Sequence, residues 1–93
     1  MIRLSGQLIC TTHAQARAVM MGLPAHTRLT RAEPGCLSFD VMATDDPLIW
    51  QVDEAFTDRA AFDAHQTRTG ASDWAVQTAD IPRDYLITED GAA

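Results

Sequence analysis

Alternating apolar and polar positions predict four strands along the chain. The pattern runs through Ile2 to Cys10, Cys36 to Ala43 and Leu48 to Phe56, and more briefly through Asp84 to Thr88. A repeat of two residues is typical of a strand that buries one face. In the second of these strands, the face predicted to be buried consists of Leu37, Phe39 and Val41.

A long helix is predicted from His13 to about Arg31, where apolar residues recur at helical spacing. Thr12 precedes it and can cap it, since a threonine oxygen accepts from an unpaired backbone N–H of the first turn. Gly22 and Pro24 interrupt the pattern, because proline loses a backbone hydrogen bond inside a helix. We expect a kink there, or a second short helix with Pro24 in its first turn.

A second helix is predicted after Thr57 or Asp58, either of which can act as its cap. Phe62 and His65 fall on one side of this helix, at a spacing of three residues. Ser72 can cap a further short helical stretch that contains Trp74.

The predicted order is strand, helix, strand, strand, helix, strand. This order is typical of the ferredoxin-like split βαβ fold, an α+β class with a four-stranded antiparallel sheet and helices on one face. The 93 residues fit one domain, residues 1–93. The other sheet face also carries apolar groups that the chain's own helices do not cover. We therefore expect a two-fold homodimer, the commonest closed assembly.

The charge balance argues against nucleic acid and anionic membrane surfaces as partners. The formal net charge is −6, with seven arginines, no lysine and thirteen carboxylates. A nucleic-acid binder usually presents a basic face, because phosphate neutralisation supplies much of its affinity. No basic segment followed by a long apolar stretch opens the chain, so a cytoplasmic location is expected.

The sequence favours neither a metal site nor a nucleotide cofactor. Cys10 and Cys36 lack a CxxC spacing, and His13, His26 and His65 lie far apart. No glycine-rich phosphate-binding motif occurs. We expect no cofactor and no metal, and we expect the cysteines to be free apolar core residues, with a disulfide between two strands as the alternative.

One pair of residues stands out as candidate chemistry. Glu54 shares a strand face with Trp50 and Phe56, and His65 lies on the helix side that should meet the sheet. A carboxylate that faces an imidazole among aromatic residues can act as an acid–base pair. In this hypothesis His65 is the general base or donor, and Glu54 is its orienting partner.

A structural interpretation stays open beside the catalytic one. Buried polar groups need partners whatever they do, so the Glu54–His65 pair could simply fix the helix to the sheet. Similarly, Trp50, Phe39 and Phe62 are either walls of a substrate pocket or plain core.

An ordered set of motifs resembles the antibiotic biosynthesis monooxygenase family, from about residue 29 onward. Glu33 to Leu37 reads EPGCL and resembles the family's strand entry. Asp45 to Pro47, followed by Trp50 and Glu54, resembles its hairpin and third strand. The helix up to Ala64-His65 is similar to its alanine–histidine helix motif.

The resemblance implies a ferredoxin-like fold whose dimer packs sheet on sheet into an α/β barrel. It also implies oxidation of a small aromatic or quinol substrate by molecular oxygen, with neither metal nor flavin in several relatives, because an electron-rich substrate anion can react with oxygen directly. The alternative is a non-catalytic small-ligand-binding or assembly module on the same dimeric scaffold, since fold does not fix function.

Two departures from the family's pattern narrow the expected substrate. The relatives that degrade haem resemble one another in a first-strand asparagine and in a tryptophan shortly before the helix histidine. Here the first strand offers Gln7, and no tryptophan lies shortly before His65. Haem degradation is therefore disfavoured. The aromatic-oxidising relatives carry several pocket tyrosines, whereas Tyr85 is the only tyrosine of this chain.

Overall fold

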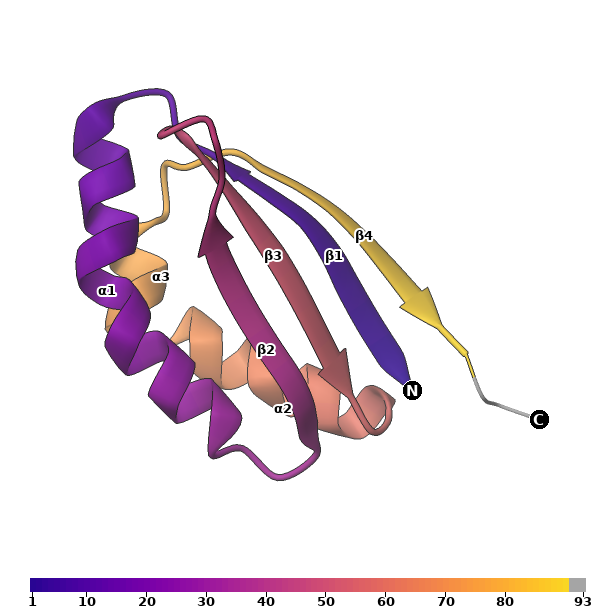
Figure 1. The fold of residues 1–93 in the computed structure, drawn as a ribbon. Helices are drawn as coiled ribbons and strands as arrows, with labels where there is room; N and C mark the ends of the chain where they lie inside the picture. Colours follow the sequence, from indigo (N-terminus) through magenta and orange to yellow (C-terminus); the bar gives the residue numbers. More distant parts are fainter. Residues whose placement is uncertain (91–93) are drawn as a thin grey trace.

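The computed structural model describes residues 1–90 and has the predicted order of strands and helices (Figure 1). The elements are β1 (Ile2–Ile9), α1 (His13–Arg31), β2 (Cys36–Ala43), β3 (Ile49–Phe56), α2 (Arg59–Gly70), α3 (Asp73–Gln77) and β4 (Arg83–Glu89). The strands form one antiparallel sheet in the order β2-β3-β1-β4. This is the split βαβ arrangement, so the predicted fold class is confirmed.

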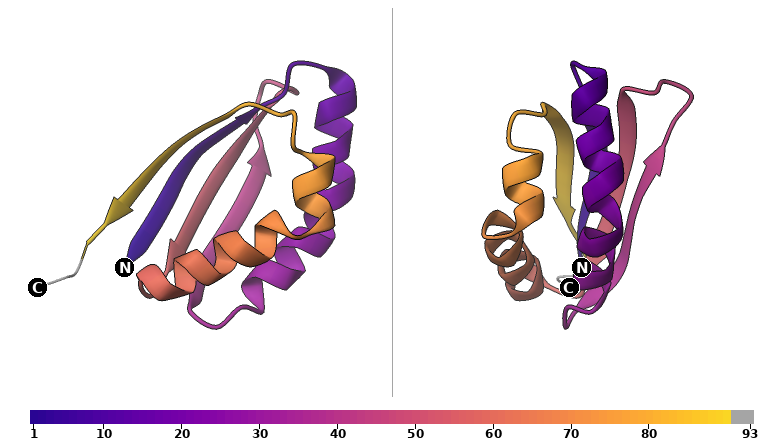
Figure 2. Two further views of the ribbon diagram at one scale, coloured as in Figure 1. Left: turned by 180° about the vertical axis from the view of Figure 1, so that it is seen from behind. Right: turned by 90° about the vertical axis from the view of Figure 1, so that its left-hand side faces the viewer.

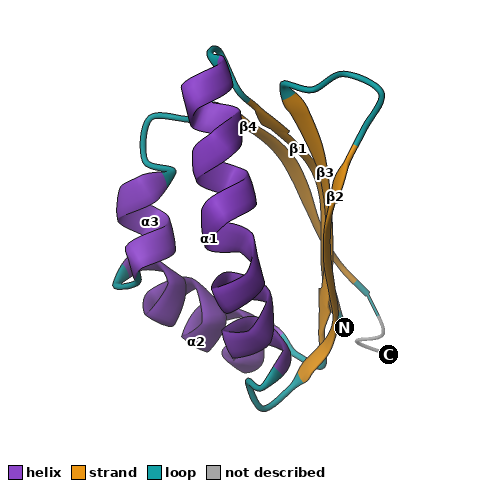
Figure 3. Ribbon diagram, turned by 60° about the vertical axis from the view of Figure 1, so that its left-hand side comes forward, coloured by secondary structure: helices purple, strands orange, loops and turns teal. Residues whose placement is uncertain are grey.

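The helices form a single layer on one face of the sheet, and the other face is open (Figure 3). The views from behind and from the side show α3 lying against α1, while α2 crosses the lower part of the sheet (Figure 2). Apolar side chains fill the space between the layers, and the most buried of them are Ile2, Leu8, Val19, Val52 and Phe56. The sheet does not close on itself.

Helix α1 runs from His13 to Arg31 as one helix, with Pro24 inside it. Of the two alternatives predicted at Pro24, a kink or a second short helix, the second is therefore wrong. Buried residues in both halves, Val19 before the proline and His26 and Thr30 after it, hold the helix on the sheet. This packing outweighs the roughly 3 kcal/mol that a proline costs inside a helix.

Strand β2 contains a bulge that the alternation did not predict. Cys36 pairs with Phe56 and Ser38 pairs with Ala55, so Leu37 is an extra residue without a partner in β3. An extra residue of this kind is left out of the ladder. Leu37 is consequently exposed, whereas Phe39, on the same predicted face, is buried. The expectation that Leu37 faces the core is wrong.

The open face of the sheet is mixed rather than uniformly apolar. Its centre is polar: Ser5 donates a hydrogen bond to Asp53 Oδ1 at 2.7 Å across the β1–β3 pair. Apolar groups lie toward the two edge strands, with Met42 on β2 and Leu86 on β4 both exposed. The predicted apolar groups on this face are present, and they flank a polar centre.

At Gly6, β1 has no room for a side chain beside β4. A Cβ atom there would overlap the carbonyl oxygen of Asp84 and lie 2.8 Å from Cα of Tyr85, so the backbone of β4 would have to move. We expect Gly6→Ala to lower the free energy of unfolding by roughly 1–3 kcal/mol, the usual cost of overpacking. Denaturant unfolding measures this change. The control is Gly70→Ala, where the added Cβ meets nothing within 4 Å; equal stabilities of the two variants would contradict the prediction.

Candidate functional site

Helix α2 places His65 between the helix layer and the sheet. The helix begins after Asp58, whose carboxylate accepts a hydrogen bond from Ala61 N at 2.8 Å, so Asp58 is the cap of the two predicted candidates. His65 lies on the inner side of α2 and is only 2% exposed. Phe56 packs on its ring at a centroid distance of 4.8 Å. The imidazole therefore has a fixed position and little contact with solvent.

Glu54 of β3 is a direct neighbour of His65, as the sequence predicted. Its Oε1 lies 3.4 Å from Nε2 of His65, and the two side chains are 8% and 2% exposed. The contact is an ion pair without the geometry of a good hydrogen bond, and Oε1 is buried without a hydrogen-bond partner among residues 1–90. Glu54 thus keeps an oxygen that can still accept a hydrogen bond.

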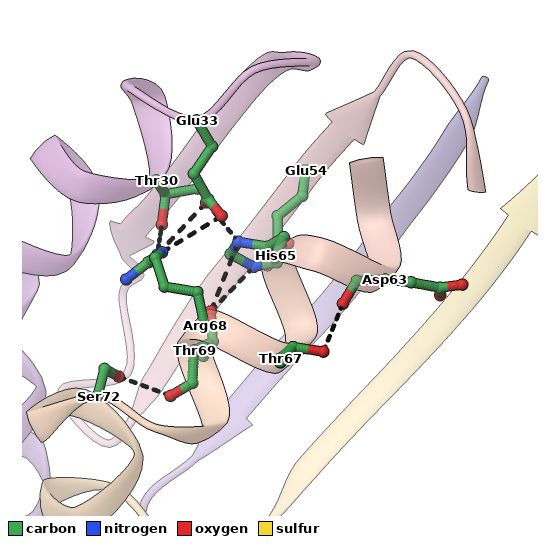
Figure 4. A network of polar contacts seen from close by, with 9 residues as sticks. All are labelled: Thr30, Glu33, Glu54, Asp63, His65, Thr67, Arg68, Thr69 and Ser72. Carbon is green, nitrogen blue, oxygen red and sulfur yellow. Dashed lines mark hydrogen bonds and ion pairs between the residues drawn. The ribbon is translucent and has the colours of Figure 1, made fainter. Parts of the chain in front are cut away.

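The stronger partner of His65 is Glu33, which was predicted only as part of the EPGCL motif and was given no role at the site. Glu33 Oε1 lies 2.7 Å from Nδ1 of His65, so the imidazole is held between two carboxylates (Figure 4). Gly35 allows this placement because its φ of 86° turns the chain directly after Glu33-Pro34. The EPG triplet after a helix was the only signal for this residue in the sequence.

Arg68, one turn of α2 after His65, completes the cluster. Its guanidinium forms an ion pair with Glu33 at 3.2 Å and donates a hydrogen bond to Thr30 Oγ1 at 3.0 Å. The cluster thereby ties the end of α1 to α2 as well as to β3. Two carboxylates are matched by two cations, so the buried charges are balanced.

The neighbours of this cluster set its protonation. Burial by itself lowers the pKa of His65, but the charges of Glu54 and Glu33 outweigh it and hold that pKa above its usual value. Burial by itself would raise the pKa of Glu33. The hydrogen bonds and positive charges of Arg68 and His65 outweigh burial, so the pKa of Glu33 lies below its usual value. The surroundings therefore favour His65 as an imidazolium that donates from Nδ1 to Glu33 and faces Glu54 with Nε2, rather than as a free base.

A cavity of about 220 Å³ adjoins the Glu54–His65 pair. Its lining combines polar groups with aromatic and aliphatic surface from both layers. The residues that line it are Leu4, His26, Glu54, His65, Gln66, Thr69, Trp74, Arg83 and Tyr85. A hollow that combines a few polar groups with apolar and aromatic surface can bind a small molecule.

The three aromatic residues predicted as pocket walls do not line this cavity. Phe62 packs edge-on against Phe56 at 5.7 Å, and Phe39 is buried next to His26. Trp50 is half-buried against the core near the beginning of β3. All three have their side chains in the interior, where large apolar groups fill the space between the layers. Trp74 and Tyr85 take their place as the aromatic walls.

Tyr85 and Arg83 bring β4 into the site. Burial, aided by the charge of Glu54, raises the pKa of Tyr85 to about 12, so its phenol is a hydrogen-bond donor. Arg83 donates to the carbonyl oxygens of Thr78 and Ile81 at 2.9 Å each, which fixes the loop that follows α3. Arg83 thus holds this loop, and it lines the cavity together with the neighbouring Tyr85 phenol.

The remaining sequence expectations concern cysteines, metals and membranes. Cys10 and Cys36 are free thiols, as predicted, and burial raises the pKa of both. No group of three or more metal-ligating side chains occurs within residues 1–90. Over the same residues, no helix has the length and apolar character that a membrane span requires.

Comparisons with known proteins agree with this architecture. The family model for antibiotic biosynthesis monooxygenases matches residues 12–77, which include Glu33, Glu54, His65 and Trp74. The chain belongs to the antibiotic biosynthesis monooxygenase family. No curated protein matches the sequence.

Solved structures share the fold of this monooxygenase-family chain over nearly its whole length. One is a Nitrosomonas europaea protein named after the same family, with 23% identity, a TM-score of 0.83 and coverage of 97% of this chain and 98% of that one. Another is Rv0793 of Mycobacterium tuberculosis, with 22% identity, a TM-score of 0.81 and coverage of 99% and 98%. At these identities the likeness supports the fold, and the chemistry has to be argued from the site.

Proposed function

We propose that this chain is a monooxygenase that oxidises a small aromatic or quinol substrate with molecular oxygen and needs neither metal nor flavin. The observation that carries the proposal is the Glu54 carboxylate, which has an unpaired oxygen beside the clamped His65 at the wall of a cavity of about 220 Å³. This arrangement supplies a base where a small ring can bind.

In the proposed reaction, Glu54 takes the proton of a substrate hydroxyl. The resulting anion is electron-rich and reacts with oxygen directly. One oxygen atom enters the ring and the other leaves as water, with all the electrons supplied by the substrate, as when a hydroquinone becomes a hydroxyquinone. The chain contributes a desolvated cavity, the base and the placement of the ring.

The roles of the two predicted residues are exchanged in this proposal. His65 was expected to be the base and Glu54 its orienting partner. Because the pKa of His65 is raised and Glu33 binds its Nδ1, the imidazole is already protonated and fixed. His65 is therefore the positioning residue, and its positive charge stabilises the anion that forms when Glu54 removes the proton.

A non-catalytic binding or assembly module is the second candidate. It is favoured by the 2% exposure of His65, since the Glu33–His65–Glu54 cluster would also be needed merely to join α1, α2 and β3. In that case the cavity would bind a small molecule without turning it over.

Oxygen uptake separates the two candidates. Purified protein, treated with a chelator and checked for the absence of flavin absorbance, is incubated with a panel of hydroquinones and naphthoquinols in an oxygen electrode. The monooxygenase proposal predicts uptake above the substrate's own autoxidation, with water rather than peroxide as the reduced product. Saturable ligand binding without any uptake would support the binding module instead.

We also propose a homodimer that packs the open sheet faces together. Met42 and Leu86 are exposed on this face, and a second copy would cover both of them. Sedimentation at micromolar concentration should therefore show a species of twice the 10.2 kDa chain mass. Introducing charge by Leu86→Glu is expected to dissociate it, whereas Val76→Glu, on exposed α3, is the matched control. A monomeric wild type would refute the dimer.

A further inference from the structure

His26 of α1 is a buried polar group that the proposed reaction does not use. It is 5% exposed, and its Nδ1 is buried without a hydrogen-bond partner among residues 1–90. Most buried polar atoms have a partner, so an unpaired one needs an explanation. His26 lines the same cavity as Glu54 and His65, and its ring centroid lies 6.2 Å from that of His65.

Two aromatic neighbours hold the ring of His26 in one orientation. Trp74 stacks on it with the ring centroids 4.5 Å apart and an interplanar angle of 3°, and Phe39 meets it edge-on at 5.2 Å. Gly22, one helical turn before His26, leaves room for this stack, since a Cβ there would lie 3.1 Å from the Trp74 ring. The imidazole is therefore presented to the cavity as a rigid group.

The surroundings of His26 keep it neutral. Burial, followed by the positive charges of Arg68 and His65, lowers its pKa to about 4, although the carboxylate of Glu33 partly opposes this shift. A neutral imidazole has one N–H and one lone pair. Nδ1 is buried and unpaired, so an N–H there would be a buried donor without an acceptor. The tautomer with the proton on Nε2 and the lone pair on Nδ1 avoids this cost. Nε2 then carries the one N–H that His26, as a lining residue of the cavity, has to offer a ligand.

We propose that Nε2–H of His26 donates a hydrogen bond to a second oxygen of the substrate, so that the site selects aromatic rings with two oxygen functions over monophenols. The proposal rests on the proposed function for the first oxygen, which is the hydroxyl that meets Glu54. Glu54 reaches the cavity from the sheet and His26 from the helix layer, so the two groups bind the ring from different walls. The Trp74–His26 stack supplies a flat apolar surface beside them.

Binding without oxygen tests this inference independently of turnover. Wild-type protein labelled with ¹⁵N-histidine is titrated anaerobically with hydroquinone and with 4-methylphenol, which has the same shape but lacks the second oxygen. We expect hydroquinone to shift the Nε2 signal of His26 together with the signals of His65. We also expect it to bind roughly tenfold more tightly than 4-methylphenol, which is the effect of one hydrogen bond. The exposed His13 serves as an internal control.

A matched variant checks the same assignment. His26→Phe retains a ring that can stack on Trp74, and calorimetry should show hydroquinone and 4-methylphenol binding with nearly equal affinity, while 4-methylphenol binds as it does to wild type. If this variant does not fold, the wild-type titration decides. The proposal would be overturned by an unmoved His26 signal at saturation or by equal affinities of the two ligands for wild type. It would also be overturned if the His26 signal shifted without those of His65, because the ligand would then lie in the groove between α1 and α3. Selective binding without oxygen uptake would instead refute only the monooxygenase reaction.

Discussion

Replacing Glu54 by glutamine is expected to lower the rate of oxygen uptake by roughly 10²- to 10⁴-fold, the usual contribution of a placed general base. Glutamine has nearly the same shape but cannot take the substrate's proton. It also leaves the 2.7 Å contact between His65 and Glu33 in place, so the clamp on the imidazole survives. Uptake is measured in the oxygen electrode, and unfolding by denaturant is measured in parallel.

The matched control is Asp63→Asn, the same chemical exchange on α2. Figure 4 shows the Asp63 carboxylate pointing away from His65 and Glu54. This variant should keep the wild-type rate. A Glu54→Gln protein that is folded and as active as wild type would rule out Glu54 as the base.

His65→Gln separates the positioning role from a purely structural one. Loss of the imidazolium leaves Glu33 and Glu54 without their shared partner, at a cost of about 1–3 kcal/mol in stability. If His65 also supports the chemistry, kcat should fall with KM little changed. Reduced stability with an unchanged kcat would assign the residue to structure alone.

Most of the fold was predictable because the hydrophobic pattern and the caps agree with the tertiary arrangement. The alternation found three strands nearly to the residue, and Asp58 marked the beginning of α2 correctly. The two misses have a common cause, since both depend on contacts between distant segments. Packing on the sheet carries α1 through Pro24, and pairing with β3 expels Leu37 from the ladder.

The candidate site was predictable only in part for the same reason. Glu54 and His65 could be paired because the side-chain periods of a strand and a helix placed both of them on inner faces. Glu33 lies in a turn, where no period applies, and its approach to His65 depends on the path of the chain at Gly35. The aromatic walls were missed because Trp50, Phe39 and Phe62 fit the pattern of core residues equally well.

Acid is expected to destabilise the protein through His26. Its pKa is lowered from 6.5 to about 4 in the folded state. Between these pH values His26 is therefore protonated in the unfolded chain and neutral in the folded chain. Stability therefore falls as the pH is lowered through this window. A shift of this size corresponds to about 3 kcal/mol in the free energy of unfolding.

Two other groups with shifted pKa values, His65 and Glu33, act mainly outside this window. His65 has a raised pKa, so its stabilisation is complete below pH 6.5 and is lost as the pH rises through the folded value. Glu33 has a lowered pKa, so its stabilisation is present above 4.5 and is lost only as the pH falls through its folded value. Among these three groups, His26 is therefore the one whose protonation makes the free energy of unfolding change with pH between 6.5 and 4.5.

Urea unfolding of wild type and of His26→Phe across this range tests the assignment. The variant retains an aromatic ring against Trp74 but has no group to protonate at this position, so its free energy of unfolding should depend much less on pH. Plotted against pH, the free energies of wild type and variant should diverge toward neutral pH by about 3 kcal/mol. His13→Gln makes a comparable exchange at an exposed position and should follow the wild-type curve. Parallel curves for wild type and His26→Phe would mean that His26 is protonated as readily in the folded chain as in the unfolded one. The neutral N–H donor that the cavity requires would then be lost as well.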